Sequence, residues 1–221
     1  MVGRKGGFVK TLAFVMAGLL LVLLFIIVMK TPEPIPAGSY DFVLNPEKDP
    51  AQRETSEKEF PIRISHGTMM LTPLAEYDIT AAVLSKKRYY FGWSAEMAPF
   101  DYALGWGTLA VKEARATVRF SQSGRWYYYR LREESPFSPG YVALHSSNHH
   151  IIPATPNLRY LLKRLKTGEL IRLTGYLVYA HGFVKGKEVF WRSSLSRKDT
   201  GDGACEVFYV HTAYYRGSVY E

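Results

Sequence analysis

The chain has 221 residues, a formal net charge of +8 and 47% hydrophobic residues. Its one cysteine, Cys205, excludes an internal disulfide, so an apolar core must hold the soluble part together. A lipoprotein is also excluded, because no cysteine closely follows the apolar segment at the N-terminus.

Residues 1–30 predict a short cytoplasmic stub followed by a membrane anchor. Residues 11–29 carry no charge, and a helix of this length spans a hydrocarbon core of about 30 Å, so we expect them to contact membrane lipid. A cleaved secretory signal is the alternative, but such signals have a shorter apolar region. Arg4, Lys5 and Lys10 precede the segment. This predicts a protein of the bacterial inner (cytoplasmic) membrane with its N-terminus in the cytoplasm and its C-terminal domain outside.

Residues 31–60 predict an acidic, proline-containing linker. In the segment TPEPIP every second residue is a proline, which favours an extended, polyproline-like chain. We expect this linker to space the extracytoplasmic domain, residues 61–221, away from the bilayer. That domain is basic, which is typical of a solvated surface but also suits anionic lipid headgroups or an acidic partner.

Alternating hydrophobic residues predict that this domain is rich in β-strands. Tyr77, Ile79, Ala81 and Val83 would share one face of a strand, and ATVRF and WYYYRLR would form a hairpin around SQSG. The segment ELIRLTGYLVYA is the clearest strand, and Gly175 within it predicts a bulge, a sharp bend or a close approach to another backbone. KEVFWRSSL and CEVFYVHT predict two further strands.

One amphipathic helix is expected in the segment TPNLRYLLKRLKTG. Asn157 is its expected N-cap and Gly168 its expected end. Four leucines at helical spacing would pack against the sheet. They are Leu158, Leu161, Leu162 and Leu165. A helix lying on the membrane surface is the alternative. In the segment AEMAPFDYALGWGTLAVKEA we expect a short helix and then a tight turn that packs Trp106 against the core.

These elements together predict an α+β fold that is mostly antiparallel β. A small, partly open OB-like barrel with one short amphipathic helix suits the number of strands, in addition to the N-terminal transmembrane helix.

The tripeptide Asp199-Thr200-Gly201 matches the one that carries the catalytic carboxylate of aspartic proteases. The chain has no second copy, so only a homodimer could complete the carboxylate pair. Glycine and charged residues around it favour a turn, and we expect residues 198–203 to be a hairpin loop between the last two strands. Asp199, Asp202 and Glu206 could instead form a loose oxygen site for calcium.

Three histidines and the cysteine are the remaining candidates for chemistry. His145, His149 and His150 lie within six residues and could bind zinc or copper, although the pattern favours a polar loop. We expect Cys205 to be a small buried residue at the start of a strand; a thiolate paired with one of these histidines is the alternative.

Four segments resemble those of a group of uncharacterised bacterial proteins that often carry one N-terminal membrane span. They are ALGWG, HHIIPA, GELIRLTGYLV and WRSSLSRKDTGDGACEVFYV, within residues 77–210. The resemblance implies no function. TGELIRLTGYLV also resembles the first strand of OB-type barrels.

The sequence therefore predicts a single-pass, membrane-anchored binding or assembly module of the cell envelope that binds an envelope protein. We expect no cofactor and favour a protein without enzymatic activity. One alternative is a hydrolase or metal-binding enzyme that uses His149, His150 and Cys205. Another is a basic, OB-like nucleic-acid binder, which an extracytoplasmic location disfavours.

Overall fold

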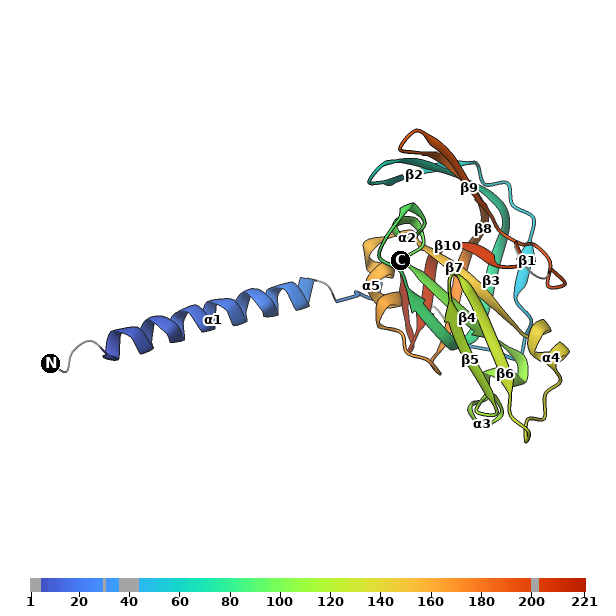
Figure 1. The fold of residues 1–221 in the computed structure, drawn as a ribbon, viewed down its shortest axis with the longest axis horizontal. Coiled ribbons are helices and arrows are strands. Elements are labelled where there is room, and N and C mark those ends of the chain that lie inside the picture. The colour runs from blue at the N-terminus through green and yellow to red at the C-terminus, as the bar shows by residue number, and fades with distance from the viewer. Residues whose placement is uncertain (1–4, 30, 36–43, 200–202) are drawn as a thin grey trace.

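The structure is a computed structural model that describes residues 5–29, 31–35, 44–199 and 203–221. A long N-terminal helix, α1 (Lys5–Met29), extends away from a β-rich body (Figure 1). Within α1, the 19 residues Val9–Ile27 are apolar enough to cross a membrane, and none of this window is buried. A membrane anchor and a signal sequence both satisfy this description.

Five strands form a barrel in the body. They are β3 (Gly67–Arg88), β4 (Phe100–Gly105), β7 (Ser146–Pro153), β8 (Leu170–Val184) and β10 (Glu206–Tyr215). Their order around the barrel is β3-β4-β7-β10-β8, and β8 pairs with β3 to complete the ring. The β7–β10 pair is parallel and the other pairs are antiparallel. This is the strand order of an OB-type barrel, so the predicted α+β, mostly antiparallel class is confirmed.

The residues that fill the barrel interior are those that the alternating hydrophobic pattern of the sequence predicted. Tyr77, Ile79, Ala81 and Val83 of β3 are all at most 1% exposed and share one core cluster with residues of β8. Helix α5 (Pro156–Arg164) lies between β7 and β8 in the chain. Its three leucines and Leu165, the C-cap residue, pack into this cluster. The N-cap is Thr155, whose hydroxyl accepts a hydrogen bond from the Leu158 amide, so the prediction of Asn157 was wrong. Pro156 takes the first helical position, where its missing N–H has no cost.

Gly175 lies at a close approach between the backbones of β8 and β10. A Cβ at this position would lie 1.9 Å from the Tyr209 carbonyl oxygen. The register of β10 against β8 shifts between Val210 and Thr212, immediately beside this contact. The predicted close approach and bulge are therefore confirmed. The strand that contains Gly175 is the fourth of the barrel in chain order, not the first as its resemblance suggested.

Beyond the barrel, β3 and β8 continue into a curved arm (Figure 1). Strands β2 (Phe60–Ile64) and β9 (Lys187–Arg192) pair on its two edges. An extra residue in β3, between Pro73 and Ala75, shifts the register and exchanges the two faces of the strand. A second core cluster forms here, in which Met69 and Val178 of the arm pack with Ile152 and Val207 from the outer face of the barrel.

Several short elements join β3, β4 and β7 in the chain, and the sequence predicted only a short helix and a hairpin among them. Strand β4 itself was missed, because its residues were read as a helix and a turn. The hairpin of β5 (Val118–Ser123) and β6 (Trp126–Leu131) is confirmed, and it packs Phe120 and Tyr127 against Ala103. The other elements are α2 (Trp93–Met97), the 3₁₀ helix η1 (Gly107–Ala110), α3 (Lys112–Arg115) and α4 (Pro139–Leu144).

Much of the described part of residues 31–60 packs on the domain and does not act as a spacer. Strand β1 (Ala51–Arg53) pairs with β3. The indole N–H of Trp106, which is buried as predicted, donates to Asp49 at 2.9 Å. The amide of Ile35 donates to Val219 in β11 (Ser218–Tyr220). The polar composition of residues 31–60 suggested a spacer, but polar residues can also pair at the edge of a sheet.

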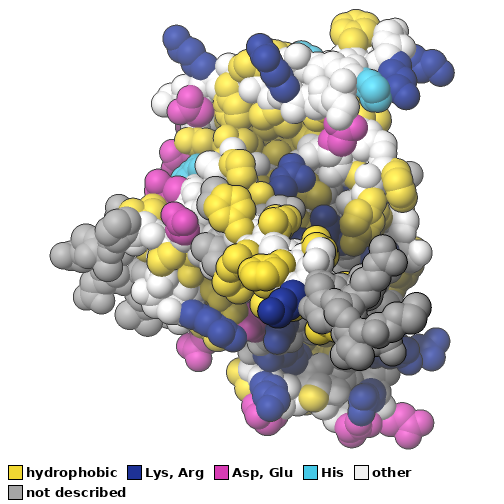
Figure 2. All heavy atoms as spheres, turned by 90° about the vertical axis from the view of Figure 1, so that its left-hand side faces the viewer, with side chains coloured by type: hydrophobic (Ala, Val, Ile, Leu, Met, Phe, Trp, Pro, Cys, Tyr) yellow, Lys and Arg dark blue, Asp and Glu magenta, His cyan; other side chains and the backbone are white. Residues whose placement is uncertain are grey.

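The surface charge is mixed on the side where α1 lies. Figure 2 shows Lys and Arg side chains beside Asp and Glu side chains at the upper and lower margins of this face, with hydrophobic side chains between them. This face is therefore not uniformly basic.

Candidate ligand-binding pocket

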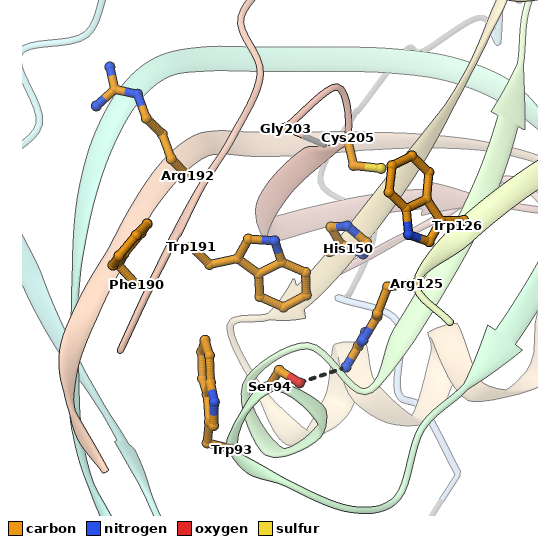
Figure 3. Close-up of a pocket in the computed structure, with 10 residues that line it drawn as sticks. All are labelled: Trp93, Ser94, Arg125, Trp126, His150, Phe190, Trp191, Arg192, Gly203 and Cys205. Carbon is orange, nitrogen blue, oxygen red and sulfur yellow. Dashed lines mark hydrogen bonds between the residues drawn. The ribbon is translucent and has the colours of Figure 1, made fainter. Parts of the chain in front are cut away.

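A cavity of about 580 Å³ lies on the outer face of the barrel. The segment between β3 and β4 contributes Trp93 and Ser94, and the turn of the β5–β6 hairpin contributes Arg125 and Trp126. Strand β9, the residues Gly203 and Cys205 just before β10, and His150 of β7 complete it (Figure 3). OB-type barrels bind oligonucleotides and oligosaccharides at this place, on the face of their second and third strands and the adjoining loops.

Aromatic side chains form most of the walls. The rings of Trp93 and Trp191 meet at 81° with their centroids 6.1 Å apart, so they form a corner. Trp126 closes the other side and is 38% exposed, while Phe190 lies at the rim and is 68% exposed. Three of the four tryptophans in the chain therefore line one cavity.

A buried carboxylate organises the floor. Asp101 of β4 is fully buried and lies directly opposite His150 of β7 in the strand register. One of its oxygens accepts hydrogen bonds from Arg125 at 2.6 Å and from His150 Nδ1 at 2.8 Å. The two partners stabilise the carboxylate, which would otherwise carry a large desolvation cost. The other oxygen, Oδ2, has no hydrogen-bond partner among the described residues.

Arg125 is held in place by aromatic rings as well as by Asp101. Its guanidinium lies 3.7 Å from the centroid of the Tyr89 ring and 5.1 Å from that of Trp191. Burial raises the pKa of Tyr89 to about 12, and the nearby Asp101 carboxylate adds to this effect. Arg125 also has a positive φ of 72°, which is rare for a residue other than glycine and persists only when its surroundings enforce it.

A second polar cluster lies at the end of the barrel next to this pocket. Arg197 forms an ion pair with the buried Glu206 and donates to the Tyr77 hydroxyl. That hydroxyl lies 3.2 Å from His149 Nε2. Burial, together with the positive charge of Arg197, holds the pKa of His149 well below its usual value, so this imidazole is neutral near pH 7.

The structure separates the three histidines that were proposed as metal ligands. His149 and His150 are consecutive in β7, so His149 points into the barrel and His150 points to the outer face. His145 lies at the end of α4 and stacks on Tyr141 with centroids 3.9 Å apart. In the described ranges, no group of three His, Cys, Asp or Glu side chains is close enough to hold a metal ion. The stretch predicted as a polar loop is a buried strand.

The residues proposed around the Asp-Thr-Gly tripeptide also behave differently from the predictions. Asp199 is exposed and accepts a hydrogen bond from the Ser194 hydroxyl at 2.7 Å. Asp202 lies outside the described residues. The segment does not close a hairpin, because β9 pairs with β8 and not with β10. Cys205 is only half-buried and lines the pocket, so the expectation of a fully buried residue was wrong.

Trp93, Arg125, Trp126 and Trp191 were not predicted as site residues. A usable signal was present, because each of them lies in or beside a segment that joins two strands, where binding residues are commonly found. Comparison with protein-family models, with curated proteins and with solved structures finds no significant match to this chain.

Proposed function

We propose that this protein is a single-pass, membrane-anchored module of the cell envelope whose OB-type domain binds a protein partner in the aromatic pocket. The observation that carries the proposal is the collection of Trp93, Trp126 and Trp191 around one cavity, with Arg125 on its floor. Tryptophan and arginine are the residue types that contribute most to protein–protein binding energy. The partly exposed Trp126 and Phe190 offer apolar area that a partner would bury.

The anchor part of the proposal is supported by α1 and by the basic residues that precede its apolar window. A cysteine introduced at the exposed Lys187, in a Cys205→Ala background, reports the side on which the domain lies. A membrane-impermeant maleimide should label this variant in intact cells from which any outer membrane has been removed. Labelling only after the cytoplasmic membrane is disrupted would contradict an extracytoplasmic domain.

The binding part is tested by photo-crosslinking from the pocket. A photoreactive phenylalanine analogue replaces Trp126 in the full-length protein, and the same analogue replaces Phe183 in a control variant. Phe183 is 63% exposed on the arm and does not line the pocket. We expect one protein species to crosslink from position 126 and not from position 183. Its yield should fall when Trp191→Ala is added. Adducts that contain only lipid, glycan or nucleic acid would refute a protein partner.

A thiol-dependent hydrolase is the second candidate function. The observation that favours it is the Asp101–His150 pair, because a carboxylate that orients a histidine is one part of a nucleophilic site and Cys205 lines the same pocket. The reactivity of Cys205 towards iodoacetamide, measured against pH, tests it. An activated thiol would react well below pH 8 and would lose this reactivity in His150→Phe. A thiol that reacts only at alkaline pH would contradict the hydrolase. Metal analysis of the purified protein tests the metal-enzyme form of this alternative.

Binding of single-stranded nucleic acid is a third candidate, favoured by the OB-type strand order and by aromatic rings on which bases could stack. Such binding would also need basic side chains that follow the phosphates. Asp101 already pairs with Arg125, which leaves Arg192 as the other arginine of the wall. Retention of single-stranded DNA that falls steeply with salt would support this candidate, whereas no retention at low salt would reject it.

A further inference from the structure

The pocket presents hydrogen-bond donors that have no acceptor in the protein. The indole N–H groups of Trp93, Trp126 and Trp191 have no hydrogen-bond acceptor among the described residues. By contrast, the indole N–H of Trp106, which lies outside the pocket, donates to Asp49. Arg125 adds further donor capacity, because its Nη2 makes only a 3.4 Å contact with the Ser94 hydroxyl. Three tryptophans and an arginine therefore line the cavity (Figure 3), and their N–H groups can donate to a ligand that brings acceptors.

Acceptors are scarce on the same walls. Of the described side chains that line the cavity, none carries a carboxylate or an amide. The nearest carboxylate, Asp101, is fully buried beneath the floor and is paired with Arg125 and His150. A ligand that brings many N–H or O–H donors would leave them unpaired on binding, which costs about 1–3 kcal/mol for each buried group. The pocket therefore favours a ligand rich in acceptors and poor in donors.

A proline-rich peptide has this hydrogen-bonding character. Proline has no backbone N–H, and a polyproline II chain has no internal hydrogen bonds, so its carbonyl oxygens remain available. Its pyrrolidine rings pack on aromatic side chains, and aromatic-lined grooves are the usual receptors of such segments. Sugars and nucleobases also stack on indoles, but they bring hydroxyl or amino donors for which the side chains of this wall have few acceptors.

The charge of the pocket indicates which residues accompany the prolines. Arg192 is exposed at the rim and supplies the positive charge of the wall, because the charge of Arg125 on the floor is already paired with Asp101. Among the described residues, no acidic side chain lines the cavity to oppose Arg192. We infer that the pocket binds a proline-rich, acidic segment of the partner protein in an extended polyproline II conformation. This inference rests on the proposed function, in which the partner is a protein.

The test uses the full-length protein in lipid nanodiscs and a fluorescein-labelled peptide of alternating proline and glutamate. Anisotropy titration should show saturable binding. A peptide with every proline replaced by alanine, and a peptide with every glutamate replaced by lysine, should each bind at least about tenfold more weakly. Equal binding of the alanine peptide, or no binding of the proline–glutamate peptide, would overturn the inference.

Variants of the protein locate the binding site. Trp126→Phe keeps an aromatic ring and removes one N–H donor, so affinity should fall about three- to tenfold, as expected for one hydrogen bond. Arg192→Glu should weaken the acidic peptide by more than this and should improve binding of the lysine peptide. The control Phe183→Leu should leave affinity unchanged. Unchanged affinity in both Trp126→Phe and Arg192→Glu would place any binding elsewhere and overturn the inference.

The outcomes also separate this inference from the proposed function. Crosslinking of a protein from position 126, combined with failure of the proline–glutamate peptide, would retain a protein partner and reject the proline-rich segment. Crosslinking of glycan or nucleic acid alone would reject both.

Discussion

Replacement of Asp101 by asparagine tests whether the buried carboxylate stabilises the pocket. Asp101 is fully buried and accepts two hydrogen bonds, from Arg125 at 2.6 Å and from His150 at 2.8 Å. Asparagine preserves the shape but removes the charge that Arg125 requires. It also places an amide group where Oδ2 has no partner in the described structure.

The expected cost of Asp101→Asn follows from this geometry. Removing one partner of a buried ion pair costs about 3–5 kcal/mol. The asparagine Oδ1 can still accept both hydrogen bonds, so we expect a cost at the lower end of this range, about 3 kcal/mol. For a chain of this size such a loss lowers Tm by about 6–12 °C. Thermal and urea unfolding of the full-length protein in detergent, followed by circular dichroism, would measure both quantities.

Asp78→Asn is the matched control. Asp78 also pairs with an arginine, Arg172, through contacts of 2.9 and 2.7 Å, but the side chains of this pair are 28% and 29% exposed. Solvent weakens such a pair, so its loss should cost about 1 kcal/mol or less. Equal destabilisation by Asp78→Asn and Asp101→Asn would refute the argument that burial makes the Asp101 interactions strong.

Three further predictions concern other parts of the fold. The pKa of His149 is lowered in the folded state, so its stabilising contribution is complete above about pH 6.5 and is lost as pH falls below this value, by roughly 1.4 kcal/mol per pH unit. Urea unfolding between pH 7 and pH 5 should show this slope in the free energy of unfolding, and His149→Phe should reduce the slope. Gly175→Ala should lower the free energy of unfolding by about 3 kcal/mol or more, because the new methyl group collides with the backbone of β10. Gly203→Ala meets only a strained φ of 90° and should cost about 1 kcal/mol, so equal Tm values for the two variants would contradict this prediction. Asp49→Ala leaves the Trp106 indole without its acceptor, so the free energy of unfolding measured in urea should fall by about 1–3 kcal/mol. An unchanged free energy of unfolding would mean that residues 44–59 act only as a spacer.

The fold class was predictable because local periodicity reports which face of a segment is buried. Alternation identified the core face of β3 and β8, and helical spacing identified the leucines of α5, since each pattern depends only on the geometry of its own element. Gly175 was identified because a glycine inside a strand commonly marks a close backbone approach.

The candidate site was not predictable in the same way. In the sequence, His145, His149 and His150 are neighbours, and proximity in the chain suggested a shared metal. In the structure, the pleat of β7 sends His149 and His150 to opposite faces, where one meets Tyr77 and the other meets Asp101.

The sequence by itself determined an apolar N-terminal helix, a β-rich domain, and the buried faces of its longest strands, because these follow from composition and periodicity. Only the tertiary structure brought Trp93, Trp126 and Trp191 together. They lie in three segments that are far apart in the chain, and the distances between them are set by the closure of the barrel and by the arm that curves beyond it. Local sequence patterns carry no information about which surfaces meet when a sheet closes on itself, so the pocket could be recognised only after the strands had been paired.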